Sequence, residues 1–150
     1  MDFNKVTAEL DFIGSSIHNI EINAKMISIS NQTKKSFALD IKCSKPLVKD
    51  GEKFGKLLMQ VGVSLKKEDE NQEPDTFKIV LEGVFKASDK VDDDKFMELL
   101  NINGGAALYS VARSKMEVLS SITYSEGKIL LPMINIIQYF SERNTPDDSE

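Results

Sequence analysis

The sequence has few of the side chains that catalytic and metal sites require. It holds one histidine, His18, one cysteine, Cys43, and no tryptophan. A zinc site takes about three or four Cys or His ligands, and a Ser–His or Cys–His catalytic pair would have to use the single histidine. We therefore expect no catalytic residue, no metal site and no cofactor, and a protein that is not an enzyme.

Two motifs that resemble ion-binding loops are incomplete. The acidic run 92–94 lacks the spaced oxygen ligands and the glycine of a calcium loop. Gly104 and Gly105 lack the Lys-Ser/Thr pair that follows in a phosphate-binding loop. The acidic run is better explained as a helix start, where carboxylates cap the first turn and oppose the helix dipole.

Basic residues are in the minority, with 19 Lys and Arg against 24 Asp and Glu and a net charge of −5. Nucleic acids and anionic membranes are bound through Lys and Arg, so we expect neither as a partner. The longest apolar stretch, Ile129 to Phe140, is too short for membrane insertion. A lone cysteine forms no internal disulfide and residues 1–5 do not resemble a signal peptide, which predicts a cytoplasmic protein.

Four segments in the first two-thirds of the chain alternate apolar and polar residues, as β-strands do. They are residues 6–29, Phe37–Cys43, Leu57–Leu65 and Phe77–Phe85, with a predicted turn at 45–53 and a hairpin loop at 66–75. His18 falls in phase with Ile20 and Ile22, and residues 14–16 predict a bulge. Cys43 alternates with core positions, which predicts a buried thiol.

After Lys86 the apolar period becomes helical. The acidic run before Phe96–Leu100 predicts a short helix, which residues 101–105 interrupt. Apolar residues from Ala107 to Ile122 then predict one helix of about five turns. A short terminal helix is expected over Ile134–Phe140.

Strands followed by helices predict an α+β fold. We expect a four-stranded antiparallel sheet packed by the long helix and the short C-terminal helix. The 150 residues fit a single domain over 1–143, followed by an acidic tail at 144–150.

Apolar residues exceed what one face of the sheet needs, since Val80 and Val84 lie on the outward face of the last strand. One explanation is a well-filled core. The other is self-association together with an exposed apolar groove for extended peptides. Six methionines fit an adaptable surface, because thioethers repack around different side chains.

Three motifs resemble those of the SecB family of export chaperones. A strand ends in Glu82-Gly83-Val84-Phe85, the long helix opens with Asn103-Gly104-Gly105-Ala106-Ala107-Leu108-Tyr109-Ser110-Val111-Ala112-Arg113, and Ile129-Leu130-Leu131-Pro132-Met133-Ile134-Asn135 leads into the last helix. The second is similar to the family's leucine and aromatic before an alanine–arginine pair, and the third to its leucine, proline and asparagine connection. The order of four strands and two helices covers nearly the whole chain.

The resemblance implies a dimer that pairs again into a homotetramer. It also implies apolar grooves that hold unfolded preproteins, or another client polypeptide, without ATP. Carried onto this chain, the groove residues are Met26, Ile27, Phe37, Ile134, Ile137 and Phe140. The oligomer interface would include Tyr109, Arg113 and Met116.

One departure from the family bears on function. The family docks on a translocase motor through acidic residues of its first and last strands, where this chain has Asn19, Asn23 and Lys78. These residues argue against such docking. The hypotheses are therefore a holdase chaperone, with protein export as one version, and a dedicated chaperone or adaptor for one partner such as an antitoxin. A small-molecule-binding domain is a third, disfavoured by the missing catalytic constellation.

Overall fold

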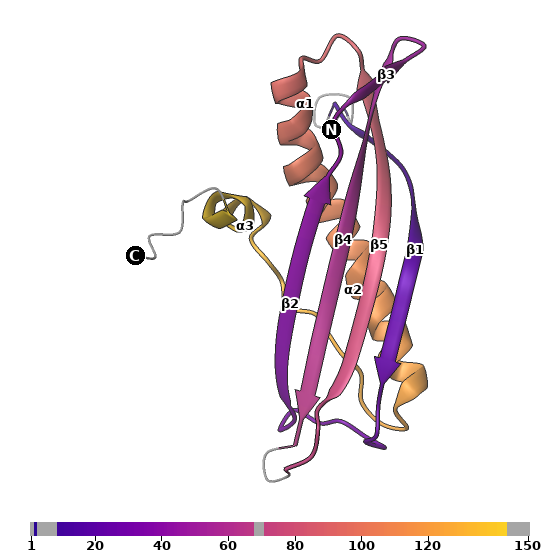
Figure 1. The fold of residues 1–150 in the computed structure, drawn as a ribbon, viewed down its shortest axis with the longest axis vertical. Coiled ribbons are helices and arrows are strands. Elements are labelled where there is room, and N and C mark those ends of the chain that lie inside the picture. Colours follow the sequence, from indigo (N-terminus) through magenta and orange to yellow (C-terminus); the bar gives the residue numbers. More distant parts are fainter. Residues whose placement is uncertain (1, 3–8, 68–70, 144–150) are drawn as a thin grey trace.

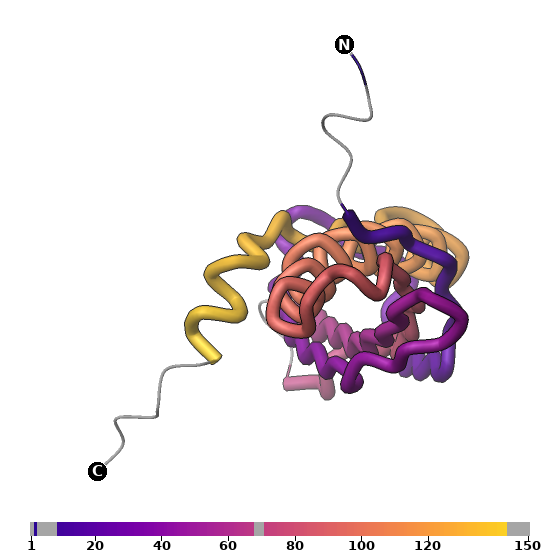
Figure 2. Tube along the Cα trace, turned by 90° about the horizontal axis from the view of Figure 1, so that it is seen from above, coloured from indigo at the N-terminus to yellow at the C-terminus, as the bar shows by residue number. Residues whose placement is uncertain are grey.

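The computed structural model of this protein describes residues 2, 9–67 and 71–143. Its elements are β1 (Asp11–Asn23), β2 (Lys34–Cys43), β3 (Leu47–Lys49), β4 (Glu52–Lys66), β5 (Asp75–Ser88), α1 (Asp93–Leu99), a π-helical segment η2 (Leu100–Gly104), α2 (Gly105–Thr123) and α3 (Ile136–Arg143). Four long strands lie side by side, and α1 and α2 cover one face of the sheet (Figure 1, Figure 2). The predicted α+β arrangement is confirmed.

The sheet has the order β1-β5-β4-β2, and all its strand pairs are antiparallel. Every second residue of the central strands β4 and β5 is buried, because successive side chains of a strand point to opposite faces. The buried set faces the helices and forms the core, including Leu57, Met59, Leu81 and Phe85. β1 and β2 are the two edge strands, so each pairs with one neighbouring long strand among the residues described.

Two bulges in β1 decide which face its residues use. The register with β5 shifts just before Gly14, which confirms a bulge close to the predicted position, and again just after Ile17. The second shift brings Ile17 and Ile20 to the same face although three positions separate them. It also turns His18 outward, where its Nε2 lies 3.2 Å from Glu82 Oε2. The prediction that His18 shares a face with the neighbouring isoleucines is therefore wrong.

A short fifth strand corrects the predicted four-stranded sheet. Residues 45–53, expected to form only a turn, contain β3, which pairs with the start of β4. Asp50 and Gly51 join the two strands with φ of 52° and 78°. Positive φ at both positions is typical of a two-residue hairpin turn, and Asp-Gly is a favoured pair there.

Cys43 is exposed, which corrects the predicted buried thiol. Its partner in the β2–β4 register is Leu57, which is fully buried. The layer that buries Leu57 in β4 therefore does not reach Cys43, the last residue of the edge strand β2. Alternation alone identified the correct face of β2 but could not show how far the helices cover it.

The helices form one continuous run rather than two separated pieces. Asp92 caps α1, because its carboxylate accepts a hydrogen bond of 2.8 Å from the Lys95 backbone N–H, which confirms the predicted helix start. Residues 101–105, predicted to interrupt, instead continue through η2 into α2. This run packs tightly on the sheet, since a Cβ added at Gly55 would lie 2.8 Å from Leu100 Cδ2.

The terminal helix α3 begins at Ile136, two residues later than predicted, and continues to Arg143. Ile136 is buried and packs close to Gly105, at the start of α2. Figure 2 shows α3 running outward from the helical layer past the side of the sheet. The predicted tail at 144–150 lies outside the described residues.

Candidate functional site

An apolar groove lies beside the edge strand β2, between that strand and the segment that leads into α3. We term it the β2–α3 groove, and its volume is about 320 Å³. It is lined by Phe37, Ala38, Leu39, Val61, Tyr109, Leu131, Pro132, Ile134, Asn135, Gln138, Tyr139 and Glu142. Most of these side chains are apolar or aromatic, and the polar ones all belong to the α3 side.

The wall of the groove is held in place by α2. The Tyr109 hydroxyl donates a hydrogen bond to the Pro132 carbonyl, and Arg113 Nε donates to the Leu131 carbonyl at 3.1 Å. Burial raises the pKa of the Tyr109 phenol, and the charge of Arg113 acts in the opposite direction. The phenol therefore stays protonated at neutral pH and remains a donor. Two side chains one helical turn apart thus fix the extended segment before α3.

The edge strand β2 is hydrogen-bonded to α3 through the backbone of Ile41. The Ile41 backbone N–H donates to the Tyr139 hydroxyl at 3.1 Å, and the Ile41 carbonyl accepts from the Arg143 guanidinium. Arg143 also lies 3.8 Å from an Asp40 carboxylate oxygen and donates to the Tyr139 hydroxyl at 3.2 Å. These bonds set the position of α3 across the strand edge.

The structure brings only part of the predicted groove together. Phe37 and Ile134 both line it. Phe140 contributes to the docking of α3, since it lies 3.6 Å from a Cβ placed at Gly105. Ile137 is 62% exposed and is not among the lining residues, because it follows the buried Ile136 on the other side of α3.

Met26 and Ile27 lie elsewhere, in the crossover between β1 and β2. Met26 borders a small hollow with Leu65 and Asp75, where β4 ends and β5 begins. Ile27 is 78% exposed, and its carbonyl accepts a hydrogen bond of 2.9 Å from the Ser125 backbone N–H. Neither residue is among those that line the groove, and groove membership of these two stays a prediction.

The predicted oligomer residues lie mostly inside the chain. Met116 is fully buried and Tyr109 is 7% exposed, so neither presents much surface to a second copy in this conformation. Arg113 is half-buried and bonded to the Leu131 carbonyl. The exposed large apolar residues of α2 are Val118, at 59%, and Ile122, at 76%.

Several groove residues were not identified from the sequence. Leu39 follows Phe37 in the same alternating phase, and that alternation was the signal that could have added it to the groove residues. Tyr139 carried no such signal, because its role depends on α3 crossing a strand nearly a hundred positions earlier in the chain.

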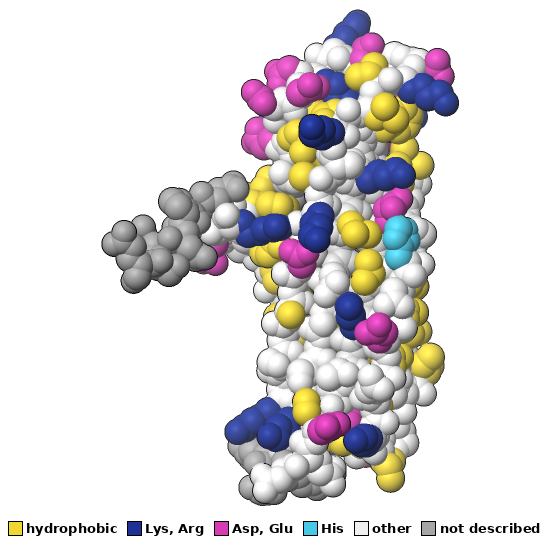
Figure 3. Space-filling view, viewed as in Figure 1, with side chains coloured by type: hydrophobic (Ala, Val, Ile, Leu, Met, Phe, Trp, Pro, Cys, Tyr) yellow, Lys and Arg dark blue, Asp and Glu magenta, His cyan; other side chains and the backbone are white. Residues whose placement is uncertain are grey.

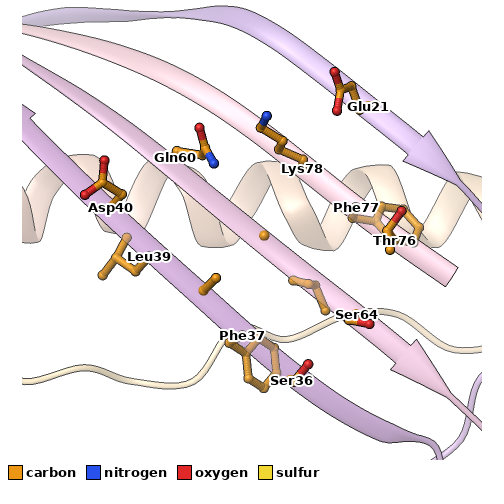
Figure 4. A pocket seen from close by; sticks show the side chains of 13 residues that line it. Glu21, Ser36, Phe37, Leu39, Asp40, Gln60, Ser64, Thr76, Phe77 and Lys78 are labelled. Atoms are coloured by element: carbon orange, nitrogen blue, oxygen red, sulfur yellow. The ribbon is translucent and has the colours of Figure 1, made fainter. Parts of the chain in front are cut away.

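A second hollow lies on the outer face of the sheet, with a volume of about 410 Å³. Figure 4 shows Glu21, Lys78, Gln60 and Asp40 around it, one from each of the four long strands. The hollow exists because the outward residues at its centre are small, such as Gly62, which pairs with Ala38. It is lined by Phe37, Leu39, Val63 and Phe77 as well as by polar side chains. Glu21, Asp40 and Lys78 place charges around it, which makes it less suited to apolar segments than the groove.

The outer face carries both signs of charge, dispersed over the strands (Figure 3). Glu82 lies within 3.2 Å of His18 Nε2 and 3.6 Å of Lys56 Nζ. Lys78 lies opposite Glu21 in the register of β1 with β5. This face therefore lacks a uniform acidic surface among the residues described.

Comparison with solved structures finds the same architecture in a chaperone. One matching structure is the Mycobacterium tuberculosis Rv1957 SecB-like chaperone in complex with a ChAD peptide from the Rv1956 HigA1 antitoxin, with a TM-score of 0.60. The match covers 88% of this chain and 95% of that chain. This chain has a SecB-like fold. Sequence identity between the two chains is 10%, so the likeness is one of fold alone.

Comparison of sequences adds no relative: no protein-family model matches the chain, and no curated protein does. Across 9–67 and 71–143, no helix is long and apolar enough to cross a membrane.

Proposed function

We propose that this protein is an ATP-independent holdase chaperone that binds unfolded or extended polypeptides in the β2–α3 groove. The observation that carries the proposal is the position of an apolar, aromatic-lined groove beside an open strand edge. Such a site suits an extended chain, because backbone hydrogen bonds give affinity without strict sequence dependence and the groove accepts apolar side chains. Folded proteins keep most such side chains inside, so the site favours unfolded clients.

One groove supplies limited affinity. Phe37 is 42% exposed, and burial of apolar surface contributes about 25 cal/mol per Å² before the cost of ordering the client is subtracted. Several grooves in one assembly would act together through effective concentration. We therefore include in the proposal a cytoplasmic dimer of dimers, in which four chains of 16.8 kDa give about 67 kDa.

A dedicated chaperone for one partner is the second candidate. It is favoured by the structural neighbour, which is solved with a peptide from an antitoxin. The mixed charge of the outer sheet face gives no support to translocase docking. Affinity capture from the native host separates the two versions, because export predicts many unfolded preproteins and a dedicated chaperone predicts one stoichiometric partner.

The proposal is tested by diluting guanidinium-unfolded rhodanese into buffer without nucleotide and following light scattering. The wild-type chain should suppress aggregation, and Phe37→Ser and Ile134→Ser should lose most of this effect because both remove apolar groove surface. Met133→Ser is the matched control, since Met133 is 86% exposed beside Ile134 and does not line the groove. Equal suppression by all variants, or none by the wild type, would contradict the proposal.

A further inference from the structure

Among the residues that the structure describes, the edge of β2 is open over only part of its length. Ile41 directs its N–H and its carbonyl away from β4, and both are bonded to α3. In an antiparallel pair, alternate residues direct both backbone groups to the same side. β2 and β4 pair without a bulge from Lys34 to Cys43, so Phe37 and Leu39 also direct their backbone groups away from β4.

The open part of this edge adjoins the groove. Phe37 and Leu39 line the β2–α3 groove, together with Ile134 and Pro132 on the opposite wall. A strand added beside Lys35–Leu39 would place every second side chain on the groove side. It could not extend its pairing past Leu39, because Tyr139 and Arg143 already occupy the next outward-facing residue.

Tyr139 and Arg143, the two α3 side chains that bond to the Ile41 backbone, are held in place by other contacts. Asn135 caps α3, since its side-chain oxygen accepts from the Gln138 backbone N–H at 3.1 Å. The Tyr139 and Phe140 rings meet edge to face at 5.1 Å. The Arg143 guanidinium lies 5.7 Å from the centre of the Tyr139 ring. The two capping groups are therefore positioned before any client binds.

We propose, building on the function proposed above, that Tyr139 and Arg143 are specificity-determining residues that end the client-binding edge at Ile41. The groove then takes a short extended segment, paired with Lys35–Leu39, whose alternate side chains are apolar. Any longer client binds through one such segment in each groove.

The experiment measures binding of labelled peptides to the full chain by fluorescence anisotropy. The probes alternate leucine with serine and have about five or about nine residues, which span the open edge or exceed it. The wild type should bind both peptides with similar Kd. The longer peptide can pair with the open edge in several alignments, which should improve its Kd by no more than a few-fold. The Tyr139→Phe/Arg143→Gln variant should bind the longer peptide about tenfold more tightly than the wild type does, as expected for two further backbone hydrogen bonds.

Ser141→Ala is the control, because Ser141 lies on α3 but bonds only to its own helix, at the Ile137 carbonyl. Tyr139→Phe alone keeps the ring and serves if the double variant unfolds. Amide exchange at Ile41 gives a second readout: the double variant should show protection only with the longer peptide. Equal length dependence in the wild type and the variants would overturn this inference alone. Failure of every peptide to bind would overturn the proposed function and this inference together.

Discussion

The buried carboxylate of Asp75 organises the end of the sheet where β4 ends and β5 begins. It is 2% exposed and accepts hydrogen bonds from the Lys25 and Met26 backbone N–H groups, at 2.9 and 3.1 Å, and from the Tyr124 hydroxyl at 2.7 Å. A buried charge is costly unless such partners satisfy it. One side chain thus joins the β1–β2 crossover, β5 and the end of α2.

Alkaline pH should destabilise the protein through Tyr124. Burial, the hydrogen bond to Asp75 and its charge all raise the pKa of Tyr124 above the ordinary value of 10.0. The unfolded chain therefore ionises this phenol first, so the stability it provides is complete below pH 10 and declines as pH rises above it, by up to about 1.4 kcal/mol per pH unit.

Urea unfolding of the wild type and Tyr124→Phe at about pH 8 and about pH 11 checks this sign. The variant should be less stable at the lower pH, because it lacks the hydrogen bond to Asp75, and the difference should narrow at the higher pH. Titration of lysines affects both proteins alike. A difference that stays constant or widens would contradict the assignment.

At the scale of elements, two glycines of β4 should respond in opposite ways to the same substitution. Gly55→Ala should destabilise by roughly 1–3 kcal/mol, because its Cβ would lie 2.8 Å from side-chain atoms of Phe96 and Leu100. Gly62→Ala is the matched control, since its Cβ would meet Ala38 Cβ at 3.8 Å, an ordinary contact. It should stabilise by about 0.5–1 kcal/mol, because glycine in a strand costs conformational entropy.

Thermal or urea unfolding of both variants measures the contrast. Equal effects would show that the helical run does not rest on Gly55 as closely as the structure indicates.

Element types were largely predictable because each depends on local sequence. Alternation located the four long strands, and the acids before Phe96 located the helix start at Asp92. The errors arose where one extra residue or one turn changes the geometry. The bulge after Ile17 inverted the facing of His18, and the Asp50–Gly51 hairpin added β3.

At the scale of the whole molecule, the candidate site could be predicted only in part. Phe37 and Ile134 were named because the resemblance to the SecB family implied a groove near these segments, and both line the groove. The cap formed by Tyr139 and Arg143 was not, because it depends on the path of α3 across a strand distant in sequence. No local pattern reports where a helix crosses an edge.

Self-association is expected to use the exposed apolar residues of α2. Val118→Glu/Ile122→Glu should shift sedimentation from about 67 kDa toward smaller species, because carboxylates would be desolvated in the contact. Stability of the single chain should change little, since both side chains are mostly exposed. Ser141→Glu, exposed on α3 rather than on α2, shows the effect of added charge alone. A wild-type chain that sediments as a monomer at every concentration would contradict the proposed assembly.

The proposed holdase function requires that an unfolded client occupies the β2–α3 groove. Residue-resolved amide exchange of the full chain, with and without unfolded rhodanese, measures this occupancy. Exchange should slow at Phe37 and Leu39, whose N–H groups face away from β4, and should not change at Glu21 and Lys78 on the outer face. Protection at Glu21 and Lys78 without any at Phe37 and Leu39 would contradict it.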